Sequence, residues 1–550
     1  MRIRGSLAKG LLIALAVVLI PVAAVSAQKI TPGSSCKVLN QKVVYQNKTY
    51  TCTKSGKKLA WNKGVVVKKP SPIPSPAPTV TVTASPSPAP TVTLNPTPTP
   101  SPSPSTIPPT IPNCSGIAKS EQNKFKISLQ LMNPFDQSKI LKGGGIFLKI
   151  NSIWTNYPAD IHGRIEVFLD PGRYDIDTLG PLRAEFFLSR KGFVLSVERD
   201  GQYSISNSKL VDNHCQISSE PTSAGIKRLS EVNKQGYKFV IDAIDVRPSN
   251  TTVKYTAPIS NRQTKPIVLN LYPWESEHFV LLTISNQHNP VVIGRLLRSL
   301  DLSYKIYDEV TSNFPKYTIS TSPWSRMENG KSVIAEIPSI GGIDSSKIIS
   351  CGGNACTAVS TLGMEVRWQV LQSTLWMLEH LDVYDHVLFY EQGRTFWPQN
   401  SCSPKISLKN DWGNNYQTAT GFANLMSKLI MKQIGLNFGP EESVSGDTHY
   451  QQVLAIEEIF SKNLNQNLLN IFDNKITING LEGNNIWASL MTYLGENLGG
   501  FEFYKKFFSS CNRLPDSQSN LMTIGNWKTL AELAAGKNLD SIFIQRWRMP

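Results

Sequence analysis

Residues 381–397 read LDVYDHVLFYEQGRTFW, and this stretch decides how the C-terminal half of the chain is interpreted. His386, Tyr390 and Arg394 follow one another at intervals of four residues, so on a helix they lie along one face. That arrangement is typical of side chains that line a pocket. Glu391 and Arg394 are three residues apart and can form an ion pair on the same helix. The stretch therefore predicts a helix whose candidate site residues are Glu391, Tyr390, Arg394 and His386.

The spacing of Tyr390, Glu391 and Arg394 matches the HExxH motif of zinc peptidases, in which two His hold the metal and the Glu activates a water. Only the Glu is present here. Arg394 has no lone pair for a metal, and Tyr390 could coordinate one only as a phenolate. We therefore expect no zinc and no other cofactor. Two interpretations of Glu391 stay open: a structural partner of Arg394, or the general base of a hydrolase, with Tyr390 or His386 polarising the scissile group.

Further motifs extend the pattern over residues 275–550. This region resembles a bacterial zincin-like family whose members carry a CG-rich turn, a G-x-E strand, YE-x-G-R-x-(F/Y)-W, TGFA, GG-x-x-F and a closing RW-x-x-P. The corresponding segments here are Cys351-Gly352-Gly353, Gly363-Met364-Glu365, Tyr390 to Trp397, Thr420-Gly421-Phe422-Ala423, Gly499-Gly500-Phe501 and Arg546 to Pro550. Active gluzincins, which include enhancin-like mucin-degrading peptidases, have a Glu ligand in an EGFA-like setting. This chain has Thr420 there, so the resemblance implies an α+β zincin-like fold more than it implies activity.

The elements expected before the motif helix follow the order of the N-terminal half of a zincin. We predict a strand over 278–285, a helix capped by Asn289 with Pro290 in its first turn, a strand at SVIAEI and an edge strand at GMEV. Long helices are expected after the motif. His380 lies six residues before His386, off its helical face, and His449 stands alone in SGDTHYQQ, so both are expected to be ordinary solvated histidines.

The N-terminus predicts export. Arg2, Arg4 and Lys9 precede an apolar run, and Val25-Ser26-Ala27 supplies small residues for signal peptidase, so residues 1–27 are interpreted as a signal peptide. No second run of about 20 apolar residues follows. We expect a secreted or cell-surface bacterial protein, with an uncleaved N-terminal anchor as the alternative.

The positive charge is concentrated in one small segment. The formal net charge is +15, and ten lysines without any Asp, Glu or Arg lie in residues 28–113. Residues 28–69 predict a small β-hairpin module closed by a disulfide, and residues 70–113 a Pro/Ser/Thr-rich linker. The module resembles the lysine-rich Cys-pair repeats of exported actinobacterial proteins, with its C…N-K-x-Y-x-C…GKK-L-x-W pattern. We expect it to bind an anionic cell-wall polymer or membrane surface, and not nucleic acid.

Residues 114–220 predict an antiparallel β-sandwich, since short alternating runs such as GRIEVFL and GFVLSVE are bounded by turn residues. The segment GRIEVFLDPGRYDI resembles the signature of prealbumin-like sandwiches, in which the Pro-Gly forms a tight turn and the Tyr packs into the core. Even cysteine numbers outside the cytoplasm favour disulfides, and we predict Cys36–Cys52 and Cys114–Cys215. Residues 221–274 are expected to be a β-rich connector.

Together these patterns predict a multidomain protein with a small β module, an antiparallel β-sandwich and an α+β zincin-like C-terminal domain. The leading function is binding of an extracellular peptide or glycan by a wall-associated protein that has lost its metal. The alternative is a secreted peptidase-like hydrolase that acts on wall or glycoprotein substrates through Glu391. A purely structural adhesin is the third interpretation.

Overall fold

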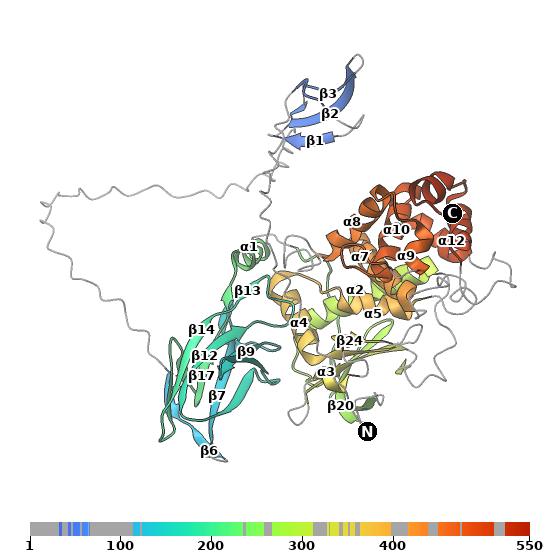
Figure 1. Cartoon of the computed structure of the whole chain (residues 1–550). Coiled ribbons are helices and arrows are strands. Elements are labelled where there is room, and N and C mark those ends of the chain that lie inside the picture. Colours follow the sequence, from blue (N-terminus) through green and yellow to red (C-terminus); the bar gives the residue numbers. More distant parts are fainter. Residues whose placement is uncertain are drawn as a thin grey trace, which may run out of the picture. The chain divides into compact units, whose positions relative to one another are not determined.

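A computed structural model of the 550-residue chain divides into two compact units, Met1–Ser105 and Thr106–Pro550 (Figure 1). The residues that the structure describes are 32–35, 42–45, 48–55, 58–63, 65–66, 114–121, 124–234, 238–257, 267–311, 327–328, 331–339, 345–349, 353–357, 363–397, 416–437, 449–473, 476–510 and 523–550. The predicted signal peptide and linker lie outside these ranges. No helix within them is both long enough and apolar enough to cross a membrane.

The first unit contains the predicted hairpin. Its antiparallel sheet has the order β1-β2-β3, and β4 pairs with β2. Tyr50, Cys52 and Trp61 form a very small core. A core of this size needs a covalent staple, and Cys52 is indeed disulfide-bonded. Its predicted partner, Cys36, lies outside the described residues. The strands are β1 (Lys42–Tyr45), β2 (Lys48–Ser55), β3 (Lys58–Trp61) and β4 (Val65–Val66).

The second unit begins with a β-sandwich, as predicted. One sheet has the order β10-β9-β12-β14-β15-β5, and the other has the order β11-β7-β17-β16, with β6 and β8 also paired to β7. All pairs are antiparallel except β17 with β7. The strands are β5 (Cys114–Ile117), β6 (Lys119–Glu121), β7 (Lys124–Asn133), β8 (Asp136–Ile140), β9 (Gly145–Ile150), β10 (Ile153–Pro158), β11 (Arg164–Leu169), β12 (Gly172–Leu179), β13 (Leu188–Ser189), β14 (Gly192–Val197), β15 (Gln202–Ile205), β16 (Lys209–Val211), β17 (His214–Ile217) and β18 (Glu220–Pro221).

The sandwich core follows from the alternation in the sequence. In β11 every second side chain is buried, which is the burial pattern of a strand with one face on a core. The predicted Cys114–Cys215 disulfide is confirmed, and it joins β5 of one sheet to β17 of the other. Pro171 and the start of β12 turn the chain from one sheet into the other. The Tyr174 hydroxyl donates to the Asp170 carbonyl at 2.8 Å, and its half-buried ring packs against the core.

The rest of the unit is built on a seven-stranded mixed sheet of order β19-β20-β21-β23-β25-β24, with β22 paired to β23. β21, β23 and β25 are parallel neighbours. The strands are β19 (Val253–Ala257), β20 (Ile267–Glu275), β21 (Phe279–Thr283), β22 (Met327–Glu328), β23 (Lys331–Ile337), β24 (Ala355–Cys356) and β25 (Met364–Arg367). GMEV therefore does not form the edge strand that we predicted, because β25 pairs on both sides and β24 lies at the edge. Residues 238–252, which lie within the connector that we expected to be β-rich, contain no strand.

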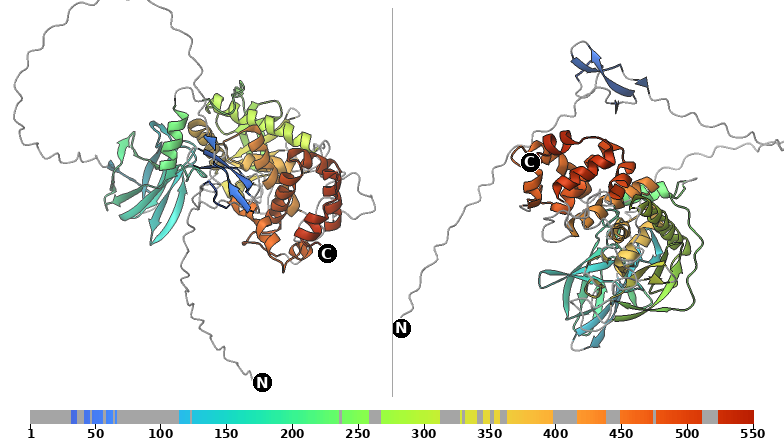
Figure 2. Two further views of the ribbon diagram at one scale, coloured as in Figure 1. Left: turned by 90° about the horizontal axis from the view of Figure 1, so that it is seen from above. Right: turned by 90° about the vertical axis from the view of Figure 1, so that its right-hand side faces the viewer.

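Helices cover this sheet and then form a separate lobe. Phe279, Leu281 and Ile334 point to the face on which α2, α4 and α5 pack, whereas Val280 and Val333 point to the other face. In both views of Figure 2 the C-terminal helices, in red, lie at the opposite end of this unit from the sandwich, in cyan. The helices are α1 (Ser223–Val232), α2 (Pro290–Thr311), α3 (Ser345–Ile348), α4 (Trp368–Leu381), α5 (Val387–Thr395), α7 (Tyr416–Ile434), α8 (His449–Lys462), α9 (Leu468–Asp473), α10 (Gly483–Leu498), α11 (Phe501–Ser510), α12 (Ile524–Ala535) and the π-helix η2 (Ser541–Arg546).

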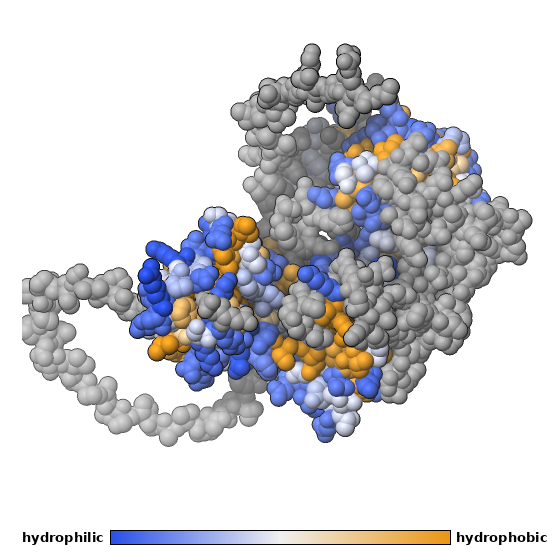
Figure 3. All heavy atoms as spheres, turned by 60° about the horizontal axis from the view of Figure 1, so that its bottom comes forward, coloured by the Kyte–Doolittle hydropathy of each residue, from blue (hydrophilic) through white to orange (hydrophobic). Residues whose placement is uncertain are grey.

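The sandwich and the C-terminal region share a hydrophobic core. Trp376, Met377, Leu381 and Val383 belong to the same buried cluster as the sandwich side chains. On the face drawn in Figure 3, the exposed hydrophobic residues form separate patches among hydrophilic ones. The two parts of this unit are therefore joined by buried apolar contacts and not by a linker alone.

Candidate functional site

The predicted motif helix is shorter than the stretch that suggested it. α4 ends at Leu381, Asp382 has left-handed backbone angles (φ 49°, ψ 45°), and α5 begins at Val387 with His386 as its N-cap. Asp382 is held by a buried ion pair with Arg295 of α2. Its other carboxylate oxygen accepts from the Asn437 amide at 3.1 Å. Residues 381–397 are thus a helix end, a fixed turn and a new helix.

Glu391 is buried on α5, with only 4 % of its surface exposed. The Thr357 N–H, just after β24, donates to its Oε2 at 3.0 Å. Nη1 of Arg394 lies 4.0 Å from the same oxygen, which is the outer limit of an ion pair. Burial raises the pKa of Glu391 to about 7, although the charge of Arg394 and the Thr357 N–H act in the opposite direction. The carboxyl group is therefore close to half protonated at neutral pH.

Tyr390, Arg394 and Thr420, the positions that the resemblance matches to zinc ligands, lie close together in this structure. The Tyr390 hydroxyl hydrogen-bonds the side chains of Thr420, on α7, and Arg394. Burial raises the pKa of Tyr390, so the phenolate that could bind a metal is disfavoured. Arg394 offers only donors, and its Nε is buried without a hydrogen-bond partner among the described residues. These residues do not fit a zinc ion.

The fourth predicted site residue, His386, is placed differently. Nδ1 of His386 lies 3.5 Å from Oδ1 of Asp385, and the His386 side chain is largely buried. Asp385 also faces the sandwich, where Nε of Arg183 lies 3.3 Å from its Oδ2. His386 is therefore held at the junction between the sandwich and α5, beside a carboxylate that joins the two.

Several motif residues have a packing role. A Cβ on Gly393 would lie 2.7 Å from the Tyr307 hydroxyl and 3.0 Å from Cα of Ala423, so only glycine lets α5 approach α2 and α7 this closely. Gly421 has the same role, since a Cβ there would lie 2.6 Å from the Asn484 carbonyl. Close packing of helices therefore explains the glycines of YE-x-G-R and TGFA.

The closing RW motif is structural as well. The Trp547 indole N–H donates to Oε1 of the buried Glu457 at 2.8 Å, and Nη2 of Arg546 donates to Oε2 at 2.8 Å. Glu457 lies on α8, so the last residues of the chain are fixed to the helical lobe. The motif keeps a buried carboxylate fully paired.

Two groups were not anticipated correctly. His380 is not a solvated histidine: its Nε2 lies 2.8 Å from the Asn133 amide of the sandwich, its Nδ1 lies 2.9 Å from the Trp376 carbonyl, and burial lowers its pKa. The second is Glu336, which was missed although a carboxylate inside the apolar strand SVIAEI is an unusual pattern. Glu336 is fully buried at the end of β23, and burial raises its pKa to about 7. The side chain of His449 lies outside the described residues.

Comparisons with known proteins give no assignment. No family model and no curated protein matches the chain. Among the solved structures that align with it are two crystal structures of a functionally unknown conserved protein from Bacillus anthracis str. Ames. A mutant form aligns with a TM-score of 0.31 and 12% identity over 80% of this chain and 70% of that chain. The other aligns with a TM-score of 0.30 and 12% identity, over 77% and 76%. At these TM-scores the similarity carries no argument about fold or function.

Proposed function

We propose that this protein is exported and binds an extracellular peptide or glycan with a zincin-like domain that no longer holds zinc. The observation that carries the proposal is the group of Tyr390, Arg394 and Thr420, the positions that the resemblance matches to zinc ligands, in which the Tyr390 hydroxyl bonds to the side chains of the other two. The Arg394 side chain is always positively charged. A zinc ion bound beside it would place two positive charges close together in a buried site, which is unfavourable.

Metal analysis of the purified full chain tests this proposal. We expect far less than one zinc per chain after dialysis against zinc-containing buffer and removal of free metal. An Arg394→His variant is the informative comparison, because it restores one ligand but leaves Tyr390 and Thr420 in place. Stoichiometric zinc in the unaltered chain would overturn the proposal.

A second candidate function rests on the pKa of Glu391. A carboxyl group with a pKa of about 7 suits a general base at neutral pH, so a metal-independent hydrolase is the alternative. Turnover of a wall or glycoprotein substrate that falls by ~10²- to 10⁴-fold in Glu391→Gln, with metal chelators present throughout, would favour this function over binding alone.

The basic module supports a role at the cell surface. Lys48, Lys54, Lys58 and Lys63 lie on or beside its strands, and residues 28–69 contain no carboxylate side chain. Attraction of such a surface to anionic wall polymers or lipids depends on charge and is screened by salt. Binding of the full chain to isolated walls should therefore fall steeply between low and high ionic strength, and binding that is independent of salt would contradict electrostatic anchoring.

A further inference from the structure

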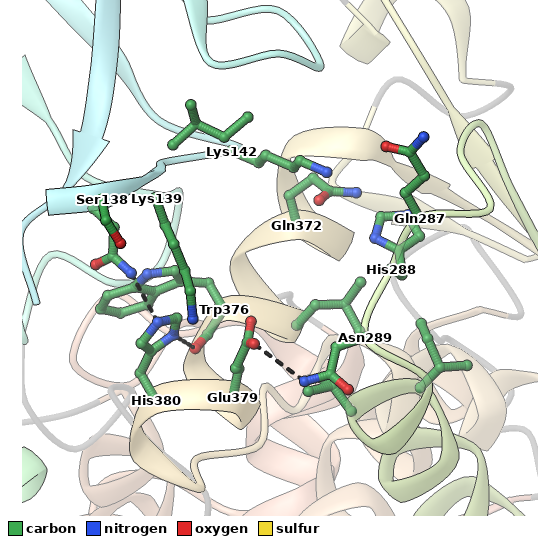
Figure 4. A pocket seen from close by; sticks show the side chains of 15 residues that line it. Ser138, Lys139, Lys142, Gln287, His288, Asn289, Gln372, Trp376, Glu379 and His380 are labelled. Atoms are coloured by element: carbon green, nitrogen blue, oxygen red, sulfur yellow. Dashed lines mark hydrogen bonds between the residues drawn. The ribbon is translucent and has the colours of Figure 1, made fainter. Parts of the chain in front are cut away.

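A cavity of about 550 Å³ lies between the sandwich and the C-terminal region, well within the range of small-molecule sites (Figure 4). Lys139 and Lys142 reach it from the sandwich, where Lys139 lies on β8 and Lys142 follows that strand. His288 comes from the loop between β21 and α2, and Gln372 comes from α4. Both parts of the unit are needed to form these walls.

The position of the cavity follows from the sheet. β21, β23 and β25 are parallel, so their carboxyl ends meet at one edge, and the chain leaves that edge into α2 and α4. Ligands in open α/β sheets bind in the crevice outside these ends. Here the sandwich closes the crevice from the other side, and the bond between Asn133 and His380 fixes the two walls together.

A buried carboxylate organises the floor of the cavity. Glu336 accepts from the Ile284 N–H at 2.9 Å and from the Gln372 side-chain NH₂ at 2.7 Å. Gln372 is therefore held in one orientation, with its NH₂ group directed at Glu336. Its amide oxygen remains an acceptor at the cavity wall, where it can receive an N–H from a ligand.

Lys139 and Glu379, which both line the cavity, already have partners: Nζ of Lys139 lies 3.5 Å from Oδ2 of Asp136, and Glu379 accepts from the Asn289 side-chain amide at 3.2 Å. Lys142 and His288 are placed differently. No carboxylate of a described residue lies within ion-pair distance of Lys142. Nε2 of His288 is buried and has no hydrogen-bond partner among the described residues. Burial, together with the charge of Lys142, lowers the pKa of His288 to about 4, so the imidazole is neutral at pH 7 and can donate one N–H. A cation beside an unpaired neutral imidazole favours an anionic oxygen.

The remaining wall has an aliphatic part and a polar part, and the polar part consists of Asn133, Ser138, Gln287, Asn289, Glu379 and His380. Ile140, Val292 and Leu375 offer only carbon atoms, and the Trp376 ring is already stacked on His380 with centroids 5.0 Å apart. A hydrocarbon side chain matches the aliphatic part of this surface, because sugar hydroxyls placed against Ile140, Val292 and Leu375 would be left without partners.

We propose that this cavity binds the C-terminal end of a peptide. The carboxylate lies at Lys142 and His288, an amide N–H of the peptide donates to Gln372, and an aliphatic side chain packs against Ile140, Val292 and Leu375. This site is separate from the Glu391 network, and it stands whether that network binds or catalyses.

Calorimetric titration of the full chain with N-acetyl-alanyl-leucine, and with the same dipeptide as its C-terminal amide, tests the proposal. The acid should bind at least about tenfold more tightly than the amide, since a hydrogen bond to a charged group contributes about 1.5–3 kcal/mol, or roughly 10- to 100-fold. Lys142→Gln should remove that preference. The matched control Lys254→Gln, at an exposed lysine of β19 on the same unit, should retain it.

Three results would overturn the proposal: equal affinity for acid and amide, binding of neither, or an unchanged preference in Lys142→Gln. Glucuronate provides the second arm, because it carries a carboxylate on a sugar. Binding of glucuronate that depends on Lys142, without binding of the dipeptide, would overturn the peptide assignment and identify an acidic sugar site.

Discussion

Replacing Glu391 by Gln is the perturbation that separates the interpretations of α5 most sharply. Gln has the shape of a protonated carboxyl group, and its oxygen can still accept from the Thr357 N–H. It removes only the charge. If Glu391 were a simple ion-pair partner of Arg394, the change would cost about 0.2–0.5 kcal/mol. The buried environment predicts a gain in stability instead.

The magnitude follows from the pKa. Burial raises the pKa of Glu391 from 4.5 to about 7, and each unit corresponds to about 1.4 kcal/mol. The folded state binds the proton more tightly than the unfolded state, so stability is highest below pH 4.5 and is lost as the pH rises to about 7. Above about pH 7 the buried, ionised carboxylate lowers the free energy of unfolding by about 3 kcal/mol. Glu391→Gln should therefore match the unaltered chain at low pH and exceed it by about 3 kcal/mol at pH 8.

Differential scanning calorimetry of the full chain at pH 5 and pH 8 measures this difference. A gain of about 3 kcal/mol should raise the transition of the C-terminal region by roughly 6–12 °C at pH 8. The pKa of Glu336 is also raised to about 7, and Glu336 still titrates in the Glu391→Gln variant. The variant's stability should therefore depend less on pH than that of the unaltered chain, but should still depend on it. The exposed Glu496→Gln is the control. A Glu391→Gln variant that melts lower than the unaltered chain at pH 8 would refute the reasoning.

Three further substitutions test the packing. Gly393→Ala should lower the free energy of unfolding by about 1–3 kcal/mol because its Cβ meets Tyr307 and Ala423, whereas Gly525→Ala, whose Cβ would lie 3.6 Å from Oγ1 of Thr523 in ordinary van der Waals contact, should not. Asp382→Asn should cost about 3–5 kcal/mol, since Arg295 would stay buried without a counter-charge; an effect below 1 kcal/mol would contradict the buried pair. Replacing both Cys114 and Cys215 by Ser should cost about 4 kcal/mol, measured by urea denaturation against the oxidised chain.

The elements that we predicted correctly are those that depend on short sequence patterns. Asn289 caps α2 as expected, with its Oδ1 accepting from the Val291 N–H at 3.1 Å, because Asn before Pro is a strong helix-start signal. The strands of the sandwich followed from alternation, and the Cys114–Cys215 pairing followed from the position of both cysteines at the ends of one module. In each of these cases the residues that decide the structure are neighbours in sequence or bracket a single domain.

The elements that were predicted wrongly depend on distant residues. Nothing in LDVYDH marks a helix end, since Asp382, which has the left-handed angles, is bonded to Arg295, almost 90 positions away in the sequence. The number of partners of β25 depends on the short strand β24, which has too few residues for a periodic signal. The cavity at Gln372 and Lys142 joins residues from the sandwich and α4, and no sequence pattern encodes such a contact.

The shared core between the two parts of the second unit determines how the proposed peptide site can work. Trp376 and Met377 of α4 are buried with the sandwich side chains, while Leu375 and Gln372, on the same helix, line the cavity. A hinge motion that opened the cavity would expose that apolar surface, at a cost of about 25 cal/mol for each Å². The walls are therefore held in place before a ligand arrives, and binding does not have to order them. The sandwich, which the sequence suggested as structural support, is in this arrangement half of a binding site.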